Sequence, residues 1–176
     1  MTHSAIEILE QGEMLLCALS DEAYTRKHSA VFNASIGGHY RHCLDHFRSL
    51  LDSIERSSVN YDRRERGTVI EFDRFAALNA TRELRDALLR FDVNSLDAPT
   101  DVTAKASYAG DGSQTARSSI GRELMYIVHH AVHHYALIGI MGGMMGLAMP
   151  AGFGVAPSTL HHMDRTRAGA HGLRIG

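Results

Sequence analysis

The sequence predicts an all-α protein, folded as a four-helix bundle. Its 176 residues are enough for one domain with its own core. Hydrophobic residues make up 44% of the chain and charged residues 22%, which is the balance of an ordinary globular protein. Apolar residues also recur at helical spacing in four long stretches. Polar segments separate these stretches, so we expect long crossing loops between the bundle helices.

Each predicted helix has a local start signal or a clear apolar face. Ser35, Asp73 and either Ser118 or Ser119 are suitable N-cap residues for the second, third and fourth helices. The second helix has apolar side chains at helical spacing, from Ile36 to Ile54. The four predicted helices run over residues 4–19, 35–56, 73–91 and 120–145.

The segments between the helices are predicted from their polar composition. Residues 57–72 are charged and are predicted to form a loop. In residues 94–118, apolar and polar side chains alternate before Gly110-Asp111-Gly112, which permits a short hairpin before the last helix. The chain after Pro150 is predicted to be irregular. We therefore expect a single domain over residues 1–160 and a mobile C-terminal tail over 161–176.

Charge, hydropathy and cysteine content set expectations about partners and location. The net charge of −2 gives no general attraction to nucleic acid or to an anionic membrane, so neither is expected as a partner. The most apolar stretch, residues 135–151, is too short for a membrane span and is predicted to be a buried helix end. The first residues do not follow the pattern of a signal peptide. Cys17 and Cys43 are predicted to be reduced core thiols, and the expected location is cytoplasmic.

Histidine is the unusual feature of this sequence, with 12 residues in all. Four of them lie in the run His129-His130-Ala131-Val132-His133-His134 of the last predicted helix. Residues i and i+4 share a helix face, so two imidazoles at that spacing can chelate one divalent ion. The run offers this twice, as His129 with His133 and as His130 with His134. Adjacent residues point about 100° apart, so only one pair can face a given site. Periodicity favours neither pair.

A third ligand is expected from the second predicted helix. His39, His42 and His46 lie there at spacings of three and four residues. Relative to the apolar stripe of this helix, His39 and His46 lie nearer the centre than His42, so periodicity ranks one of those two first. Imidazoles buried without ligands or partners would be costly, and the two windows together therefore predict a metal site.

Other reactive side chains are given structural roles. Asp45 and Glu123 could orient metal ligands, but a solvated helix surface is the favoured interpretation for both. His161 and His162 are predicted to be exposed in a loop. The methionines near the end of the last bundle helix are predicted to fill the core or a helix interface. These are Met141, Met144, Met145 and Met149.

One combination of motifs resembles a known family. The segment Ser35-Ile36-Gly37-Gly38-His39-Tyr40-Arg41-His42, followed about ninety residues later by His130-x-x-x-His134, resembles the DinB/YfiT-like family of metal-binding four-helix bundles. The resemblance implies a DinB/YfiT-like bundle in which His42, His130 and His134 are the metal ligands. Three protein ligands would leave an open coordination position, which is the arrangement of a catalytic site.

The resemblance also implies a class of function. We expect a metal-dependent hydrolase or thiol S-transferase that acts on a small molecule, with a low-molecular-weight thiol as one substrate. The expected cofactor is a divalent metal ion, zinc or nickel first and iron or copper as alternatives. A homodimer is expected as well. The alternative functions are a non-catalytic, metal-binding stress-response bundle whose ion is structural, and a bundle that serves only for protein interaction.

Overall fold

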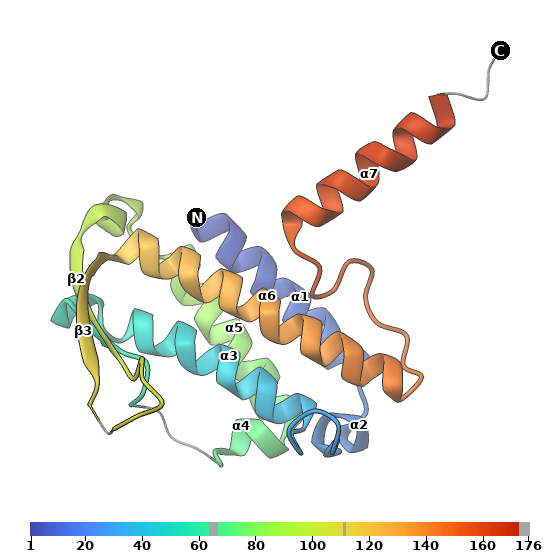
Figure 1. Cartoon of the computed structure of the whole chain (residues 1–176), viewed down its shortest axis with the longest axis horizontal. Coiled ribbons are helices and arrows are strands. Elements are labelled where there is room, and N and C mark those ends of the chain that lie inside the picture. The colour runs from blue at the N-terminus through green and yellow to red at the C-terminus, as the bar shows by residue number, and fades with distance from the viewer. Residues whose placement is uncertain (64–66, 111, 173–176) are drawn as a thin grey trace.

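Four long helices form the body of the protein. The computed structural model describes residues 1–63, 67–110 and 112–172, with the backbone alone from 167 onward. The long helices are α1 (Thr2–Ala18), α3 (Ile36–Leu51), α5 (Arg74–Leu89) and α6 (Ile120–Met144). Helices α1 and α3 each pack against both α5 and α6, so the four close around a common core (Figure 1). None of the helices in the described ranges is long and apolar enough to cross a membrane.

The caps predicted from sequence start three of these helices. Ser35 Oγ accepts a hydrogen bond from the Gly38 amide at 3.0 Å. Asp73 accepts from two amides at the start of α5, and Ser119, rather than Ser118, accepts from the first turn of α6. Each cap satisfies amides that have no partner within the helix. Local chemistry therefore fixes where α3 and α6, which carry the two histidine windows, begin.

The predicted all-α class was wrong, because the chain also forms a three-stranded mixed sheet. Strand β1 (Ser58–Asn60) runs parallel to β2 (Pro99–Ala104), and β2 pairs antiparallel with β3 (Gln114–Ser119). The last two strands are the hairpin that the sequence permits, although Asp111 in its turn lies outside the described residues. Strand β1 falls inside the predicted loop. Three residues are too few to show alternation, and its pairing partner lies about forty residues away.

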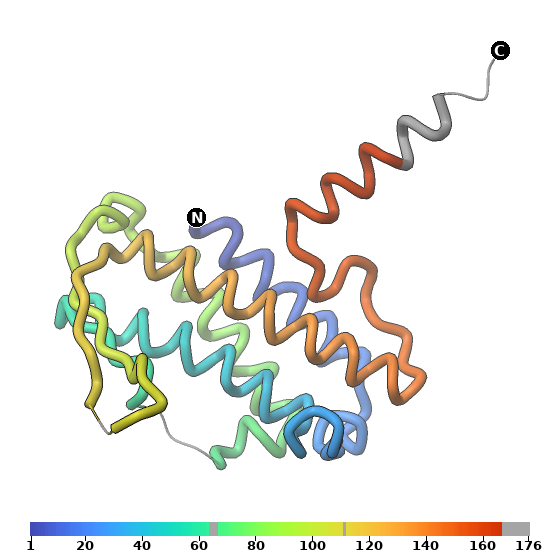
Figure 2. Tube along the Cα trace, viewed as in Figure 1, coloured from blue at the N-terminus to red at the C-terminus, as the bar shows by residue number. Residues whose placement is uncertain are grey.

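Short elements complete the chain. They are α2 (Asp21–Thr25), α4 (Val69–Phe72) and two 3-10 turns, η1 (Ile54–Arg56) and η2 (Val93–Asp97). The predicted irregular tail is instead helical over α7 (Pro157–Gly172), which points away from the bundle (Figures 1 and 2). The mobility expected of residues 161–176 stays a prediction, and residues 173–176 lie outside the described part of the chain.

Candidate metal centre

Helix α3 presents three histidines at its packed side. Its apolar face, which includes Tyr40 and Phe47, is fully buried in the core. His39 and His46 are buried with this face, and His42 is half-buried. The periodicity argument, which placed His39 and His46 nearer the centre of the apolar stripe, is thus confirmed. All three imidazoles are nevertheless within reach of α6.

Helix α6 separates its four histidines into two faces. Its buried face includes Ile127, Ala131 and Ile138. His130 and His134 are half-buried beside this face, whereas His129 and His133 are exposed. The structure thereby distinguishes the two i,i+4 pairs that periodicity could not separate.

The pair from α6 meets α3 through direct imidazole contacts. His42 Nε2 lies 2.9 Å from His130 Nε2 although the residues are 88 positions apart in the chain. The His42 and His134 ring centroids are 4.5 Å apart, and those of His130 and His134 are 4.6 Å apart. The three predicted ligands are therefore brought together at the α3–α6 interface. Their role as ligands stays a prediction.

His46 lies in the same cluster. Its ring centroid is 4.3 Å from that of His130 and 4.7 Å from that of His42. One ligand atom from each of His42, His46 and His130 can be chosen so that all lie within 4.8 Å of one another. This trio contains His46 and not His134, so geometry and the motif resemblance agree on His42 and His130 and differ in the third ring.

His39 closes the other end of the cluster. Its Nδ1 lies 3.0 Å from His134 Nδ1, and the tautomers decide which of the two donates. Burial, and then the charge of His133, lower the pKa of His39 below its usual value, so this ring is neutral at neutral pH. Its Nε2 is buried and has no hydrogen-bond partner within the described residues. The contact with His134 suits a residue that orients a ligand ring.

The cluster fits a divalent metal ion. Zinc binds imidazole nitrogen at about 2.0–2.1 Å, so two nitrogens on one tetrahedral ion lie roughly 3.3 Å apart. The 2.9 Å separation of the His42 and His130 nitrogens needs only a small outward shift to match. Neutral imidazoles are the form that binds metal.

Two carboxylates near the cluster are buried, so the expectation that they lie on a solvated surface was wrong. Glu123 is 3% exposed and accepts hydrogen bonds from Tyr61 Oη at 2.9 Å and from Ser118 Oγ at 2.6 Å. Asp45 forms an ion pair with Arg41 on the same helix. Sequence periodicity missed Glu123 because its partner Tyr61 is distant in sequence, and it gave no sign that Arg41 pairs with Asp45.

Tyr61 connects Glu123 to the histidines. Its ring stacks on His46 with the centroids 4.8 Å apart and the planes 20° apart. Burial and the neighbouring Glu123 carboxylate both raise the pKa of Tyr61 well above its usual value, so its hydroxyl stays protonated and donates. Tyr126 stacks on His130 with the centroids 5.7 Å apart. Aromatic rings therefore hold the β-sheet end of the cluster.

The remaining candidates lie away from the cluster or are buried in the core. Cys43 is a buried thiol whose pKa is raised by burial, as expected of a core thiol, but Cys17 is exposed. His161 and His162 are exposed as predicted, although they belong to α7 rather than to a loop. Met141 is fully buried, whereas Met144 is 54% exposed, so the methionines serve both the core and the surface.

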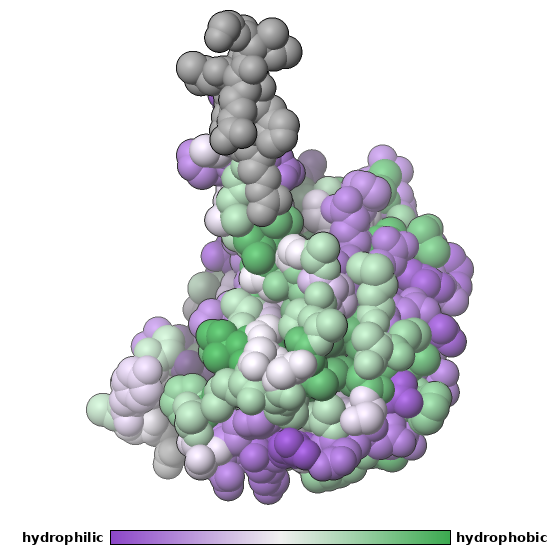
Figure 3. All heavy atoms as spheres, turned by 90° about the vertical axis from the view of Figure 1, so that its right-hand side faces the viewer, coloured by the Kyte–Doolittle hydropathy of each residue, from purple (hydrophilic) through white to green (hydrophobic). Residues whose placement is uncertain are grey.

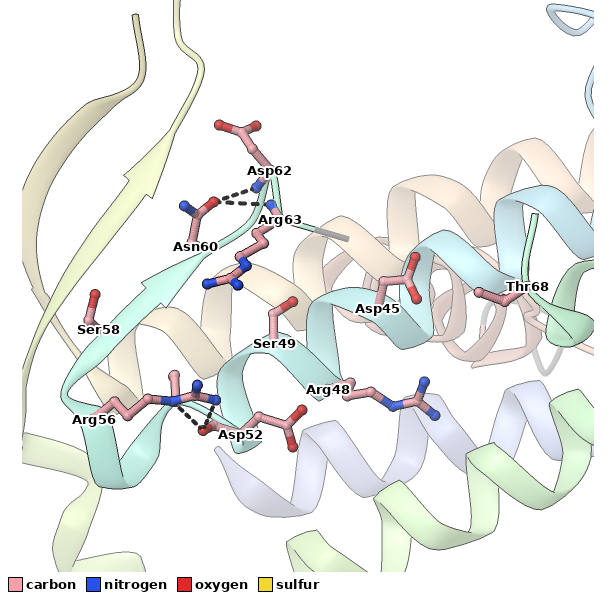
Figure 4. A pocket seen from close by; sticks show the side chains of 11 residues that line it. Asp45, Arg48, Ser49, Asp52, Arg56, Ser58, Asn60, Asp62, Arg63 and Thr68 are labelled. Carbon is pink, nitrogen blue, oxygen red and sulfur yellow. Dashed lines mark hydrogen bonds between the residues drawn. The ribbon is translucent and has the colours of Figure 1, made fainter. Parts of the chain in front are cut away.

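Two hollows border this region. The larger, of about 850 Å³, follows the outer side of α3 (Figure 4). It is lined by hydroxyl side chains and by charged side chains of both signs, among them Arg48 and Asp52. The smaller, of about 260 Å³, lies between β2, β3 and α6, where Tyr61, Glu123 and Tyr126 line it. Two of the residues that line the smaller hollow, Tyr61 and Tyr126, also stack on His46 and His130.

A helical bundle with a histidine cluster between two of its helices defines the class of protein. The chain belongs to the DinB family, whose family model matches residues 10–155. The match includes both histidine windows and the whole sheet.

Comparison with individual proteins supports the fold. A DinB-like protein of Bacillus cereus is 14% identical, with a TM-score of 0.56 over 82% of this chain and 89% of that one. A DinB-like protein of Bacillus subtilis is 16% identical, with a TM-score of 0.52 over 85% and 89%. At these identities the likeness shows the fold alone.

A curated relative is closer in sequence but much longer. FK506-binding protein 5 of Rhizopus delemar is 37% identical over 107 residues, which are 61% of this chain. The match spans only 28% of that protein's length.

Proposed function

We propose that this DinB protein is a metal-dependent enzyme that transfers a low-molecular-weight thiol to a small electrophile or hydrolyses a small molecule. His42, His130 and His134 would hold a divalent ion, zinc or nickel, and leave one position open. The observation that carries the proposal is the meeting of His42 with His130 across the α3–α6 interface, at 2.9 Å between their Nε2 atoms. The family match supports a metal site in this bundle, and the trio His42, His46 and His130, whose ligand atoms lie within 4.8 Å of one another, supports two of its three proposed ligands.

Within this site, the chain's own residues would bind the ion and orient its ligands. A bound divalent ion supplies Lewis-acid activation of a thiol or water. His39 contacts His134 Nδ1 and would hold that ring so that Nε2 faces the ion. Tyr61, fixed by Glu123, and Tyr126 form the wall between the histidines and the 260 Å³ hollow. That hollow is where we propose that a small-molecule substrate approaches.

A second candidate function is a non-catalytic bundle in which the ion is structural. The packing of α3 against α6, which the ion would tie together, favours it, because an ion bound only by the folded state stabilises that state. If no coordination position of the ion could exchange its ligand, the ion would stabilise the fold and could not bind a substrate.

We also propose a cytoplasmic homodimer. Ile140 and Met144 on α6 are 57% and 54% exposed, and Met163 on α7 is 42% exposed. Apolar side chains gather on the face that carries the end of α6 and the base of α7 (Figure 3). An apolar surface of this kind commonly marks an interface in an oligomer.

The test combines elemental analysis with an activity screen. Protein purified without chelators is expected to contain about one divalent ion per chain, and the screen pairs several low-molecular-weight thiols with electrophiles. Metal-dependent turnover supports the enzyme. One tightly held ion without turnover supports the structural alternative. If no ion is found and added zinc does not bind, both functions are excluded.

A further inference from the structure

Helices α3 and α6 each direct a matched pair of histidines at the other. His42 and His46 are i and i+4 on α3, as His130 and His134 are on α6. The family resemblance uses three of these four rings and leaves His46 out. The His46 and His130 centroids are 4.3 Å apart, whereas those of His42 and His130 are 4.9 Å apart. His46 is thus as close to the cluster as the predicted ligands are.

The surroundings of His46 hold its ring in this position. The residue is 5% exposed, and Tyr61 stacks on it nearly parallel, with the planes 20° apart. Tyr61 is itself fixed through its hydrogen bond to the buried carboxylate of Glu123. A chain of three residues from β1's end, α6 and α3 therefore determines how His46 faces His42 and His130.

We propose that His46 supplies a fourth nitrogen to the ion held by His42, His130 and His134 while no substrate is bound. This inference rests on the proposed function, since it assumes an ion at that centre. Zinc sites can expand to five ligands, so a substrate can still bind. With His46 in the fourth position, a thiol or a water molecule would bind as a fifth ligand.

The test replaces the ring and keeps its shape. His46→Phe preserves a flat ring for Tyr61 to stack on and removes both nitrogens. We expect zinc affinity, measured by competition with a chromophoric chelator, to fall on the order of a hundredfold. We expect the visible spectrum of the Co²⁺ form to lose intensity as water replaces a nitrogen. His129→Phe, on the exposed face of α6, is the matched control and should change neither.

Controls for folding and for His134 make the outcome decisive. Thermal unfolding of the metal-free variants establishes that they fold, and His46→Gln serves as a second variant if His46→Phe does not. Unchanged affinity and spectrum in a folded His46 variant would overturn the inference and leave the proposed function intact. Absence of metal binding by the wild type would overturn both. If His134→Phe binds zinc like the wild type while His46→Phe does not, three ligands suffice and the four-nitrogen centre is wrong.

Discussion

Each of two faces of α6 carries a pair of histidines, but the two pairs lie in different environments. His130 and His134 lie against α3, where they meet His42, whereas His129 and His133 are exposed. Both pairs have the spacing of a metal chelate, and both lie in the same apolar run. The difference between them comes from α3, which is close to one face and absent from the other. Spacing can therefore nominate a chelating pair, but a partner helix selects it.

The contrast extends along the helix beyond the histidines. On the inner face, Glu123 is buried and hydrogen-bonded, and Tyr135 packs in the core. On the outer face, Met125 and Ile140 are about half exposed, at 49% and 57%. Changes on the inner face should therefore be costly for metal binding or stability, and equivalent changes on the outer face should be nearly silent.

The sharpest test of this contrast is His130→Ala against His129→Ala. At zinc concentrations a hundred times the wild-type Kd, one bound ion adds about 2.7 kcal/mol to the free energy of unfolding. We expect this gain to persist in His129→Ala and to be mostly lost in His130→Ala, because His130 contacts His42. Denaturant unfolding with and without zinc measures it. Equal gains in the two variants would show that the inner face is not the metal site.

Gly12→Ala tests the packing of the inner face. A Cβ at Gly12 on α1 would lie 2.3 Å from the hydroxyl oxygens of both Tyr40 and Tyr135. Tyr40 cannot move away without losing its hydrogen bond to Thr81. We expect a loss of about 3 kcal/mol in the free energy of unfolding, at the upper end for overpacked cores.

Chemical denaturation of the metal-free protein measures the effect of Gly12→Ala. A loss of less than about 1 kcal/mol, the lower end of the overpacking range, would mean that α1 and α6 are not as close as described.

Tyr61→Phe tests the buried carboxylate of the inner face. The substitution keeps the ring that stacks on His46 and removes the hydroxyl that donates to Glu123. The Glu123 oxygen then stays buried without that donor, and we expect a loss of about 1–2 kcal/mol. Tyr108→Phe, at a fully exposed side chain, is the control and should have no effect. If both variants unfold alike, the Glu123–Tyr61 contact contributes nothing to stability.

Local signals explain what the sequence could predict. Caps such as Ser35 and Asp73 and the apolar periodicity depend on neighbouring residues, so the long helices could be located from sequence. The histidine windows could be found for the same reason. The choice of His130 and His134 as ligands came from the resemblance rather than from spacing.

The features that were missed depend on residues far apart in the chain. Strand β1 exists because it pairs with β2, and the buried Glu123 accepts hydrogen bonds from Tyr61 and Ser118. His46 ranked high on its helix by periodicity, but its proximity to His130 follows only from the packing of α3 on α6. Contacts of this kind leave no periodic trace in either partner's own segment.

The smallest expected effect lies on the outer face, at Gly143. A Cβ there would meet no described atom within 4 Å, and the residue is exposed near the end of α6. Alanine lowers the entropy lost on forming the helix, so Gly143→Ala should stabilise the chain by about 0.5 kcal/mol. Denaturant unfolding at low protein concentration measures this.

If a second copy covers the end of α6 closely, as a homodimer could, the added methyl would instead weaken association at high concentration. Sedimentation at two concentrations separates these outcomes, so this substitution also tests whether the outer face is a surface or an interface.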